Sequence, residues 1–152
     1  MKHARNWILL ALTGYMALAC QRTPYLAETT FENDCWNIED TLSFDLDLPA
    51  AEADSQLLHI KVLFLEDYAF RNIYLKLMVH EPGGNTRDTL LHELMVDPQG
   101  YWTLPRRQGG YPLELRLPLN SFQPPGSYQF RLTQYMRPAK LCNIRSVAVW
   151  VE

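Results

Sequence analysis

The sequence predicts an all-β protein, an antiparallel β-sandwich that is jelly-roll-like and has about eight strands. Apolar and polar residues alternate in many short runs, which is the pattern of strands that bury one face. Turn signals rich in Gly, Pro, Asn and Asp separate these runs every 8–15 residues, a spacing typical of antiparallel sandwiches. No stretch has a convincing helical period, which argues against an α/β architecture.

The first three expected strands show the clearest alternation. In residues 42–48, leucine and phenylalanine alternate with serine and aspartate. Residues 58–64 and 73–79 alternate in the same way, with a lysine among the residues of each outer face. The segment 81–85 then predicts a turn, because its two glycines can adopt a positive φ without a steric penalty.

The remaining strands are expected in the second half of the chain. In residues 88–96 we expect a strand with Leu90, Leu94 and Val96 on one side. Pro118 has no backbone N–H, so the strand that contains it should lie at a sheet edge or end early. The other expected strands are residues 101–104, 113–119, 128–133 and 147–151.

The amino terminus has the features of an export signal. Lys2 and Arg5 give it positive charge, and residues 7–19 carry no charge and include a strongly apolar run. A basic segment followed by an apolar one is typical of a signal peptide. The uncharged stretch is shorter than the roughly 20 residues that a membrane-spanning helix needs. We therefore assign residues 1–19 to a lipoprotein signal peptide.

Cys20 follows Ala17-Leu18-Ala19, an arrangement that resembles a bacterial lipobox, although Ala17 stands where leucine is usual. Lipidation of Cys20 would give a stable membrane anchor, because several acyl chains act together. The alternative is an ordinary secretory signal, since Ala-Leu-Ala is itself a cleavage site. We expect residues 20–35 to form a lipidated tether and residues 36–152 a single β-sandwich domain.

Two further cysteines, Cys35 and Cys142, stand 107 positions apart near the two ends of the expected domain. The oxidising periplasm permits a disulfide between them. Two separate buried thiols are the other interpretation, because the sequence does not show how closely their Cα atoms approach. No C-x-x-C motif occurs, so a thioredoxin-like or zinc-binding role has little support.

The charge balance argues against a nucleic-acid partner. The whole chain has a net charge of −3, and removal of Lys2 and Arg5 with the signal leaves 12 Lys and Arg against 17 Asp and Glu, a net charge near −5. A nucleic-acid binder needs a basic face. The same balance disfavours attraction to anionic lipid by charge alone.

We expect no enzymatic activity, no metal and no cofactor. The sequence has no H-E-x-x-H motif, no G-x-S-x-G motif and no phosphate-binding glycine loop. We expect His59, His80 and His92 on solvent-facing positions or at strand ends. Asp45 and Asp47 share one face of their strand, where a solvated surface is a simpler interpretation than a calcium or acid–base site.

A set of scattered motifs is distinctive through its order rather than through any single member. The set comprises Trp36, Phe44, Asp67-Tyr68-Ala69-Phe70-Arg71-Asn72-Ile73-Tyr74, Pro82-Gly83-Gly84, Asp88-Thr89-Leu90, Asp97, Gly100, Trp102, Gly126-Ser127-Tyr128-Gln129-Phe130, Gln134-Tyr135-Met136-Arg137, Ile144, Val147 and Glu152. In order and spacing it resembles the gliding-motility lipoprotein family GldH of the Bacteroidetes. The chain departs from the family pattern at Asn143, Ser146 and Ala148, where glycine, aspartate and glycine are expected.

This resemblance implies an envelope lipoprotein that acts as a non-catalytic component of the gliding-motility apparatus and the linked type IX secretion apparatus. Its partners would be the membrane, through the lipid anchor, and other envelope motility and secretion proteins. The residues after the lipid site lack the acidic run associated with surface display, so we expect the outer membrane and its periplasmic side. The candidate partner contacts are Phe70, Arg71, Trp102, Gln134 and Arg137, of which Gln134 and Arg137 could instead fix a strand end.

The alternative function is a carbohydrate- or ligand-binding β-sandwich lipoprotein. Several aromatic residues lie near the predicted turns, and a group around Trp102 could form a platform for a sugar. Such a module could also bind Ca²⁺ through Asp45 and Asp47. Packing within the core and the turns is the competing interpretation for most of these aromatic residues.

Overall fold

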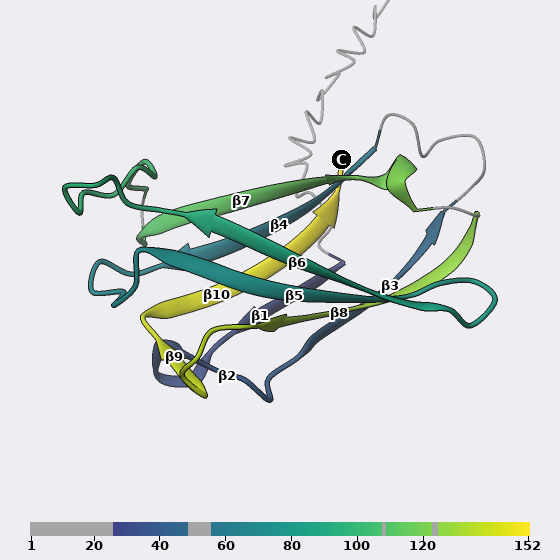
Figure 1. The fold of residues 1–152 in the computed structure, drawn as a ribbon, viewed down its shortest axis with the longest axis horizontal. Helices are drawn as coiled ribbons and strands as arrows, with labels where there is room; N and C mark the ends of the chain where they lie inside the picture. Colours follow the sequence, from purple (N-terminus) through teal and green to yellow (C-terminus); the bar gives the residue numbers. More distant parts are fainter. Residues whose placement is uncertain (1–25, 49–55, 108, 123–124) are drawn as a thin grey trace, which may run out of the picture.

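The computed structural model describes residues 26–48, 56–107, 109–122 and 125–152. Figure 1 shows two twisted β-sheets that lie one over the other, with a short two-stranded ribbon at one end. All pairings between named strands are antiparallel. The signal peptide predicted over residues 1–19 and the lipid site Cys20 lie outside the described residues.

Each sheet has four strands, and the ribbon has two. Sheet I contains, in spatial order, β1 (Ala27–Thr30), β10 (Ile144–Val151), β4 (Leu57–Phe64) and β7 (Tyr111–Pro118). Sheet II contains β3 (Leu42–Leu48), β8 (Gly126–Gln134), β5 (Asn72–His80) and β6 (Thr86–Leu94). The ribbon pairs β2 (Cys35–Asn37) with β9 (Lys140–Cys142), and the 3-10 turns are η1 (Glu32–Asp34) and η2 (Leu119–Ser121).

The strand order is that of a jelly roll. Counted along the chain, the eight strands of the two sheets have the orders 1-8-3-6 and 2-7-4-5, which is the arrangement of a double-sheet jelly roll. The predicted all-β antiparallel sandwich is therefore confirmed. Pro118 ends β7 at an edge of sheet I, as its missing N–H predicts. Residues 101–104, expected to form a strand, instead contribute an isolated bridge between Trp102 and Val96.

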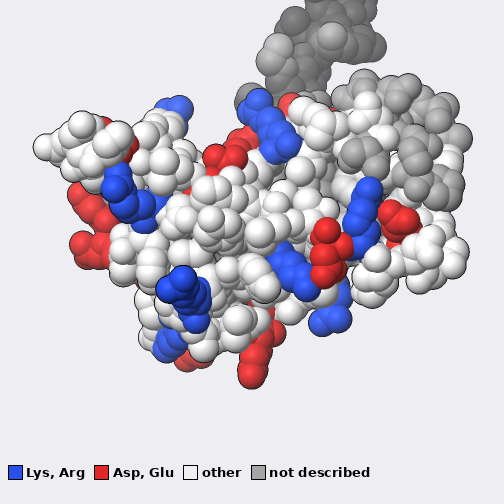
Figure 2. All heavy atoms as spheres, in the orientation of Figure 1, with Lys and Arg blue, Asp and Glu red and all other residues white. Residues whose placement is uncertain are grey.

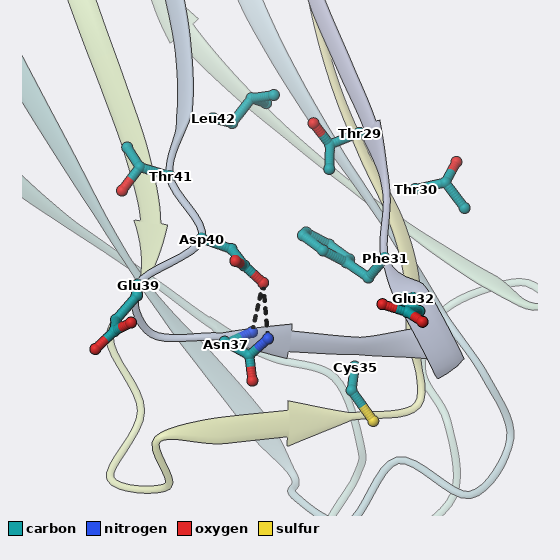
Figure 3. Close-up of a pocket in the computed structure, with 10 residues that line it drawn as sticks. All are labelled: Thr29, Thr30, Phe31, Glu32, Cys35, Asn37, Glu39, Asp40, Thr41 and Leu42. Carbon is teal, nitrogen blue, oxygen red and sulfur yellow. Dashed lines mark hydrogen bonds between the residues drawn. The ribbon is translucent and has the colours of Figure 1, made fainter.

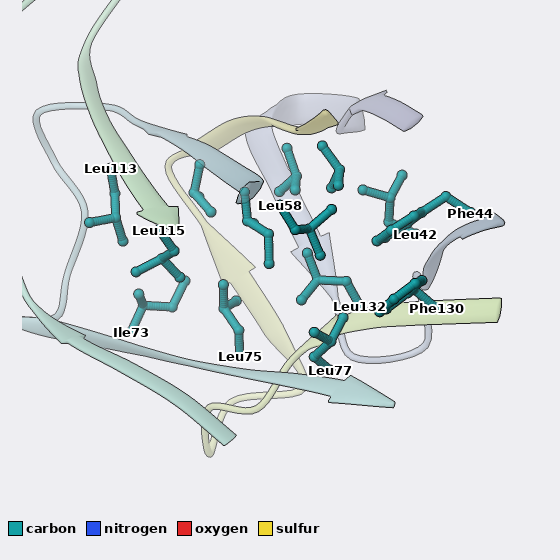
Figure 4. Close-up of a cluster of buried hydrophobic side chains, with 14 of the residues drawn as sticks. Leu42, Phe44, Leu58, Ile73, Leu75, Leu77, Leu113, Leu115, Phe130 and Leu132 are labelled. Atoms are coloured by element: carbon teal, nitrogen blue, oxygen red, sulfur yellow. The ribbon is translucent and has the colours of Figure 1, made fainter. Parts of the chain in front are cut away.

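The core lies between the sheets and is built from the alternating inner faces. The inner residues of β4 and β5 are all 0–1% exposed, namely Leu58, Ile60, Val62, Phe64, Ile73, Leu75, Leu77 and Val79. Figure 4 shows side chains from both sheets meeting in this layer, and Phe44 stacks on Phe130 with a centroid distance of 5.0 Å. Burial of each such side chain contributes roughly 1.5–3 kcal/mol, so this layer dominates the stability of the fold.

Leu90, Leu94 and Val96, predicted to share one side, differ in the structure, because the two leucines are exposed and Val96 is buried. These two residues lie on the outer face of β6 and are 54% and 58% exposed. Leu91 packs against the core instead, because it is directly opposite Leu75 of β5, and directly opposed residues share a face. Leu90 and Leu91 are adjacent, so the sequence fits either register and the pairing with β5 decides which side is buried. Val96 lies beyond β6, in the bridge with Trp102, and is buried.

The tether predicted over residues 20–35 ends earlier than expected. Residues Ala27–Thr30 form β1 and pair with β10. Phe31 is 7% exposed and stacks on Trp36 with a centroid distance of 4.9 Å. Four residues are too few to show a reliable alternation, and it is the backbone of β10 that defines this strand. The folded domain therefore includes Ala27, within the segment that was predicted to be a tether.

Asn143 joins β9 to β10 with a φ of 62°. Glycine adopts this left-handed conformation readily, and asparagine is among the few other residues that tolerate it. The side-chain amide of Asn143 also donates to the carbonyl oxygen of Asp67 at 2.8 Å. The departure from the expected glycine thus preserves the backbone path into β10.

Candidate functional site

The structure separates the five predicted contact residues. Phe70 and Arg137 line one groove on the outer face of sheet II. Arg71 is exposed next to Phe70, and its guanidinium donates to a backbone carbonyl. Trp102 and Gln134 are engaged with other parts of the domain and do not line the groove.

The groove crosses β6, β5 and the turn after β8, and its volume is about 530 Å³. It is lined by Phe70, Asn72, Tyr74, Leu90, Tyr135, Met136, Arg137 and Pro138. Leu90 is 54% exposed and Tyr135 is 56% exposed, so apolar and aromatic surface is open to solvent here. Tyrosine, phenylalanine, methionine and arginine are the residue types enriched at the centre of protein interfaces.

Gln134 holds one wall of the groove. Its side chain is 0% exposed, its Oε1 accepts the N–H of Met136 at 2.8 Å, and its Nε2 donates to the carbonyl of Pro138 at 3.1 Å. The amide therefore closes the turn that follows β8 from the inside. A buried amide with both ends satisfied rigidifies its surroundings. The sequence predicted either a partner contact or fixation of a strand end for Gln134, and these hydrogen bonds support fixation of a strand end.

The floor of the groove is held by contacts across sheet II. The ring of Tyr74 stacks on the ring of His92 with a centroid distance of 4.2 Å. The backbone N–H of Tyr74 donates to Sδ of Met136 at 3.3 Å, and the Asn72 amide nitrogen lies 3.1 Å from Nε2 of His92. These contacts hold the side chain of Tyr74 in one position in the free protein.

Tyr68 supports the groove from below. It is 7% exposed, its ring meets Phe70 edge-on at 5.8 Å, and its hydroxyl donates to the carbonyl oxygen of Asn72 at 3.1 Å. Burial raises the pKa of the Tyr68 phenol far above its ordinary value of 10.0. Because Tyr68 is buried and hydrogen-bonded, its ring contact holds Phe70 in position at the groove.

Trp102 does not provide an open platform for a sugar. Its ring is partly buried and stacks on Tyr111 with a centroid distance of 4.3 Å and an interplanar angle of 7°. It also lies 6.1 Å from the ring of Phe64, which belongs to the core. Packing under the turns, rather than ligand contact, accounts for Trp102.

Among the residues that line the groove, Arg137 alone carries a formal charge. Figure 2 views this face and shows Lys, Arg, Asp and Glu both over the middle of β5 and β6 and toward the margins, with an uncharged area over another part of these strands. Lys76 on the same face is paired with Asp88 at 2.6 Å. Arg137 is exposed, and among the described residues no carboxylate pairs with it.

Cys35 and Cys142 are directly opposite each other in the β2–β9 ribbon and are joined by a disulfide. Their Cα atoms are 3.9 Å apart. The bond ties the start of the domain to the segment between β8 and β10, which includes the turn that forms the groove wall.

A second hollow of about 510 Å³ lies beside β1, η1 and β3. Figure 3 shows Glu32, Glu39 and Asp40 around it. The Asp40 carboxylate accepts hydrogen bonds from the backbone N–H of Asn37 at 3.1 Å and from its side-chain amide at 3.0 Å. The acid therefore closes the turn after β2, which is a structural role.

The prediction that His59 faces solvent is wrong. The residue is 4% exposed, its ring stacks on Trp150 at 4.9 Å, and its Nδ1 lies 2.9 Å from Oε1 of Glu114. Partial burial raises the pKa of Glu114, but hydrogen bonds from His59 and Arg116 outweigh this effect and hold the pKa below its ordinary value. His92 is exposed on the outer face of β6, as predicted.

The described residues give no support to the alternative metal site. Asp45 and Asp47 lie on the outer face of β3, and the hydroxyl of Ser127 donates to Asp47. Within the described ranges, no three or more His, Cys, Asp or Glu side chains are grouped so as to hold a metal ion. The same ranges contain no helix long and apolar enough to cross a membrane.

Sequence reasoning missed most of the groove. The residues that it did not single out as contacts are Asn72, Tyr74, Leu90, Tyr135, Met136 and Pro138. One signal was present, because Tyr74 is an aromatic residue on the face of its strand that the alternation assigns to solvent. An aromatic side chain at such a position is informative once its neighbours are also apolar.

The fold and the groove define a class of protein, a jelly-roll sandwich with an open groove of apolar and aromatic side chains on the outer face of one sheet. A model of the GldH lipoprotein family matches residues 24–151, and the chain therefore belongs to that family. It is a gliding-motility-associated lipoprotein, and the family indicates a lipid-anchored protein of the cell envelope.

The comparisons with curated sequences and with solved structures do not add a function. No curated protein sequence matches the chain. A solved structure described as a "non-crystalline cellulose specific carbohydrate-binding module: CBM28" has a TM-score of 0.48 and 10% identity, with 80% of this chain and 70% of that chain covered. A chain of the "infectious bursal disease virus Gx strain" has a TM-score of 0.22 and 11% identity, with 82% and 32% covered. Both scores are too low to indicate function.

Proposed function

We propose that this protein is a non-catalytic component of the gliding-motility and type IX secretion apparatus. The observation that carries the proposal is the match of the GldH lipoprotein family to residues 24–151, nearly the whole domain. A binding role is consistent with the outer groove of sheet II, where apolar side chains lie open beside one unpaired arginine. Other envelope motility and secretion proteins are the proposed partners.

Lipid on Cys20 is the proposed anchor. Cys20 precedes Ala27, the first residue of β1, by seven positions. An extended chain spans at most about 3.5 Å per residue, so the domain would stay within roughly 25 Å of the lipid. Replacement of Cys20 by Ser should release the protein from membranes, and a variant that stays fully membrane-bound would contradict the anchor.

The proposed location is the periplasmic side of the outer membrane. Protease added to intact cells should leave the protein uncut, whereas the same protease should cut it after the outer membrane is permeabilised. Cleavage in intact cells would instead place the domain on the cell surface.

A clean deletion in the native host tests the function itself. The secreted proteome and surface movement of the deletion strain would be compared with those of the parent. We expect loss of type IX cargo, restored by the wild-type gene but not by the Cys20→Ala gene at matched expression. Unchanged secretion and unchanged movement would contradict the machinery role and favour the ligand-binding alternative, which a glycan array would then test.

A further inference from the structure

We propose that the outer groove of sheet II binds an extended acidic peptide segment of a protein partner. Apolar side chains of the segment pack against Tyr74, Leu90 and Met136, and a carboxylate pairs with Arg137. This inference rests on the proposed function, because it supplies the partner chemistry of a non-catalytic assembly component.

The composition of the groove favours a peptide over a sugar. A sugar needs hydrogen-bonding groups around its hydroxyls in addition to an open aromatic face. The Asn72 amide is already 3.1 Å from Nε2 of His92, and one face of the Tyr74 ring is covered by the same His92. Leu90 and Met136 offer apolar, adaptable surface that suits hydrophobic side chains.

Arg137 determines the charge of the occupant. Among the residues that line the groove it alone carries a formal charge, and within the described ranges no acid pairs with it. A guanidinium binds a carboxylate with two parallel hydrogen bonds. Arg137 therefore presents a positive group beside the apolar surface of the groove, which is complementary to an acidic, apolar segment.

The groove is also preorganised. The amide of Gln134 fixes the turn that carries Met136 and Arg137, and the disulfide of β9 holds the far end of the same segment. Stacking on His92 fixes Tyr74. A partner that binds a rigid wall loses less conformational entropy than one that must order a loop.

Site-specific photocrosslinking in the native host tests the groove. The photoreactive residue p-benzoylphenylalanine would replace Tyr135 or, in a second strain, Leu90 in the full-length chain. Gln129 is the matched control, because it is exposed on the same face of β8 but lies six residues, or roughly 20 Å, from Tyr135. We expect both groove positions, but not position 129, to give an adduct with the same short segment of one protein, rich in acidic and apolar residues.

The crosslinked segment would then be synthesised and its affinity for the purified chain measured by titration. We expect Arg137→Glu to weaken binding about tenfold or more, as is typical for a close charge pair. Arg137→Lys should weaken binding less, because lysine keeps the positive charge but not the two parallel hydrogen bonds. Arg131→Glu, an exposed charge reversal on the same face, should leave the affinity unchanged. A peptide whose acids are replaced by amides should bind weakly and should no longer respond to Arg137→Glu.

Several outcomes would overturn the proposal. These are an adduct with lipid or glycan, an adduct with a second copy of this chain, adducts equal at position 129, or no adduct at either groove position. The two proposals fail separately. If deletion abolishes secretion but Tyr135→Ser with Arg137→Glu supports it fully, the groove proposal fails and the machinery role stands. If deletion has no effect while the peptide adduct persists, the machinery role fails and the groove remains a peptide site.

Discussion

Removal of the disulfide between Cys35 and Cys142 should remove a large part of the stability of the domain. The bond joins residues 107 positions apart. In the chain-entropy account, closing a loop of that length stabilises the folded state by about 4.8 kcal/mol, because the unfolded chain loses conformational freedom. Removal of native disulfides from small secreted domains typically costs about 2–5 kcal/mol, so we expect a loss of about 3–5 kcal/mol.

The position of the bond increases its importance. The ribbon that carries it has three residue pairs, and a two-stranded ribbon is at best marginally stable by itself. Trp36 in this ribbon is 0% exposed, and its indole N–H donates to the carbonyl of Asp40 at 2.7 Å. Loss of the disulfide should therefore loosen the packing around Trp36 before the two large sheets separate.

The assay is urea unfolding of the Cys35→Ser/Cys142→Ser variant, followed by far-ultraviolet circular dichroism and by tryptophan fluorescence. Both proteins would carry Cys20→Ser, so that no third thiol can exchange with the pair. With a slope of about 2 kcal/mol per molar urea, the midpoint should fall by roughly 2 M. Reductant should lower the midpoint of the parent by a similar amount and leave the variant unchanged. A midpoint within about 0.5 M of the parent would refute the reasoning, because the loop would then contribute less than about 1 kcal/mol.

Three other predictions concern single side chains and use the same unfolding measurement. Gln134→Ala should cost about 2–3 kcal/mol because it removes two hydrogen bonds between a buried amide and partly buried backbone groups. Gln129→Ala should stay within about 0.5 kcal/mol, and equal effects would contradict the role of the Gln134 amide. Leu91→Ala should lower the free energy of unfolding by about 1–2 kcal/mol, because buried apolar surface is lost. Leu90→Ala should lower it by less than about 0.5 kcal/mol. The opposite order would show that β6 pairs in the other register. Glu114 has a folded-state pKa below its unfolded value, so its contribution is present at neutral pH and is lost as the pH falls through that pKa. The stability difference between the parent and Glu114→Gln should therefore shrink below pH 4.5, and a difference that stays constant from neutral to acidic pH would contradict this assignment.

The fold class could be predicted because period-two alternation is a local property. In β5, each of Ile73, Leu75, Leu77 and Val79 is at most 1% exposed, as the alternation predicts. Such a strand can bury only one of its faces without burying charge, so neither the partner strand nor the register needs to be known. The antiparallel jelly roll then follows from many short strands separated by turns.

Elements at the sheet edges were harder to predict because their partners define them. β1 has four residues with no strong pattern, and it exists because the backbone of β10 is available for pairing. In β6 the adjacent Leu90 and Leu91 fit both faces, and the register with β5 selects Leu91 for the core. His59 shows the same limit, because its burial depends on Trp150 of β10 and Glu114 of β7.

The groove could not be predicted as a unit because it is assembled from three separate segments. Phe70 precedes β5, Leu90 lies in β6, and Tyr135 follows β8, so no local spacing relates them. Gln134 was ambiguous for a different reason, since a polar residue at a strand end can serve a partner or the backbone. Only its buried hydrogen bonds to the turn decide between the two.

Exposure alone would not distinguish this groove from the rest of the surface. Tyr101 is 73% exposed, which is more than Leu90 at 54% or Tyr135 at 56%. Yet Tyr101 lies in a turn, where its backbone N–H donates to the carboxylate of Asp97 at 2.8 Å, and a single exposed aromatic side chain needs no explanation. At the groove, by contrast, Leu90, Tyr135 and their neighbours form one continuous apolar surface over a fixed turn. The groove combines three independent properties: a continuous apolar surface, a turn fixed by the Gln134 amide, and the unpaired Arg137. Their coincidence is the reason to assign binding to this face rather than to Tyr101.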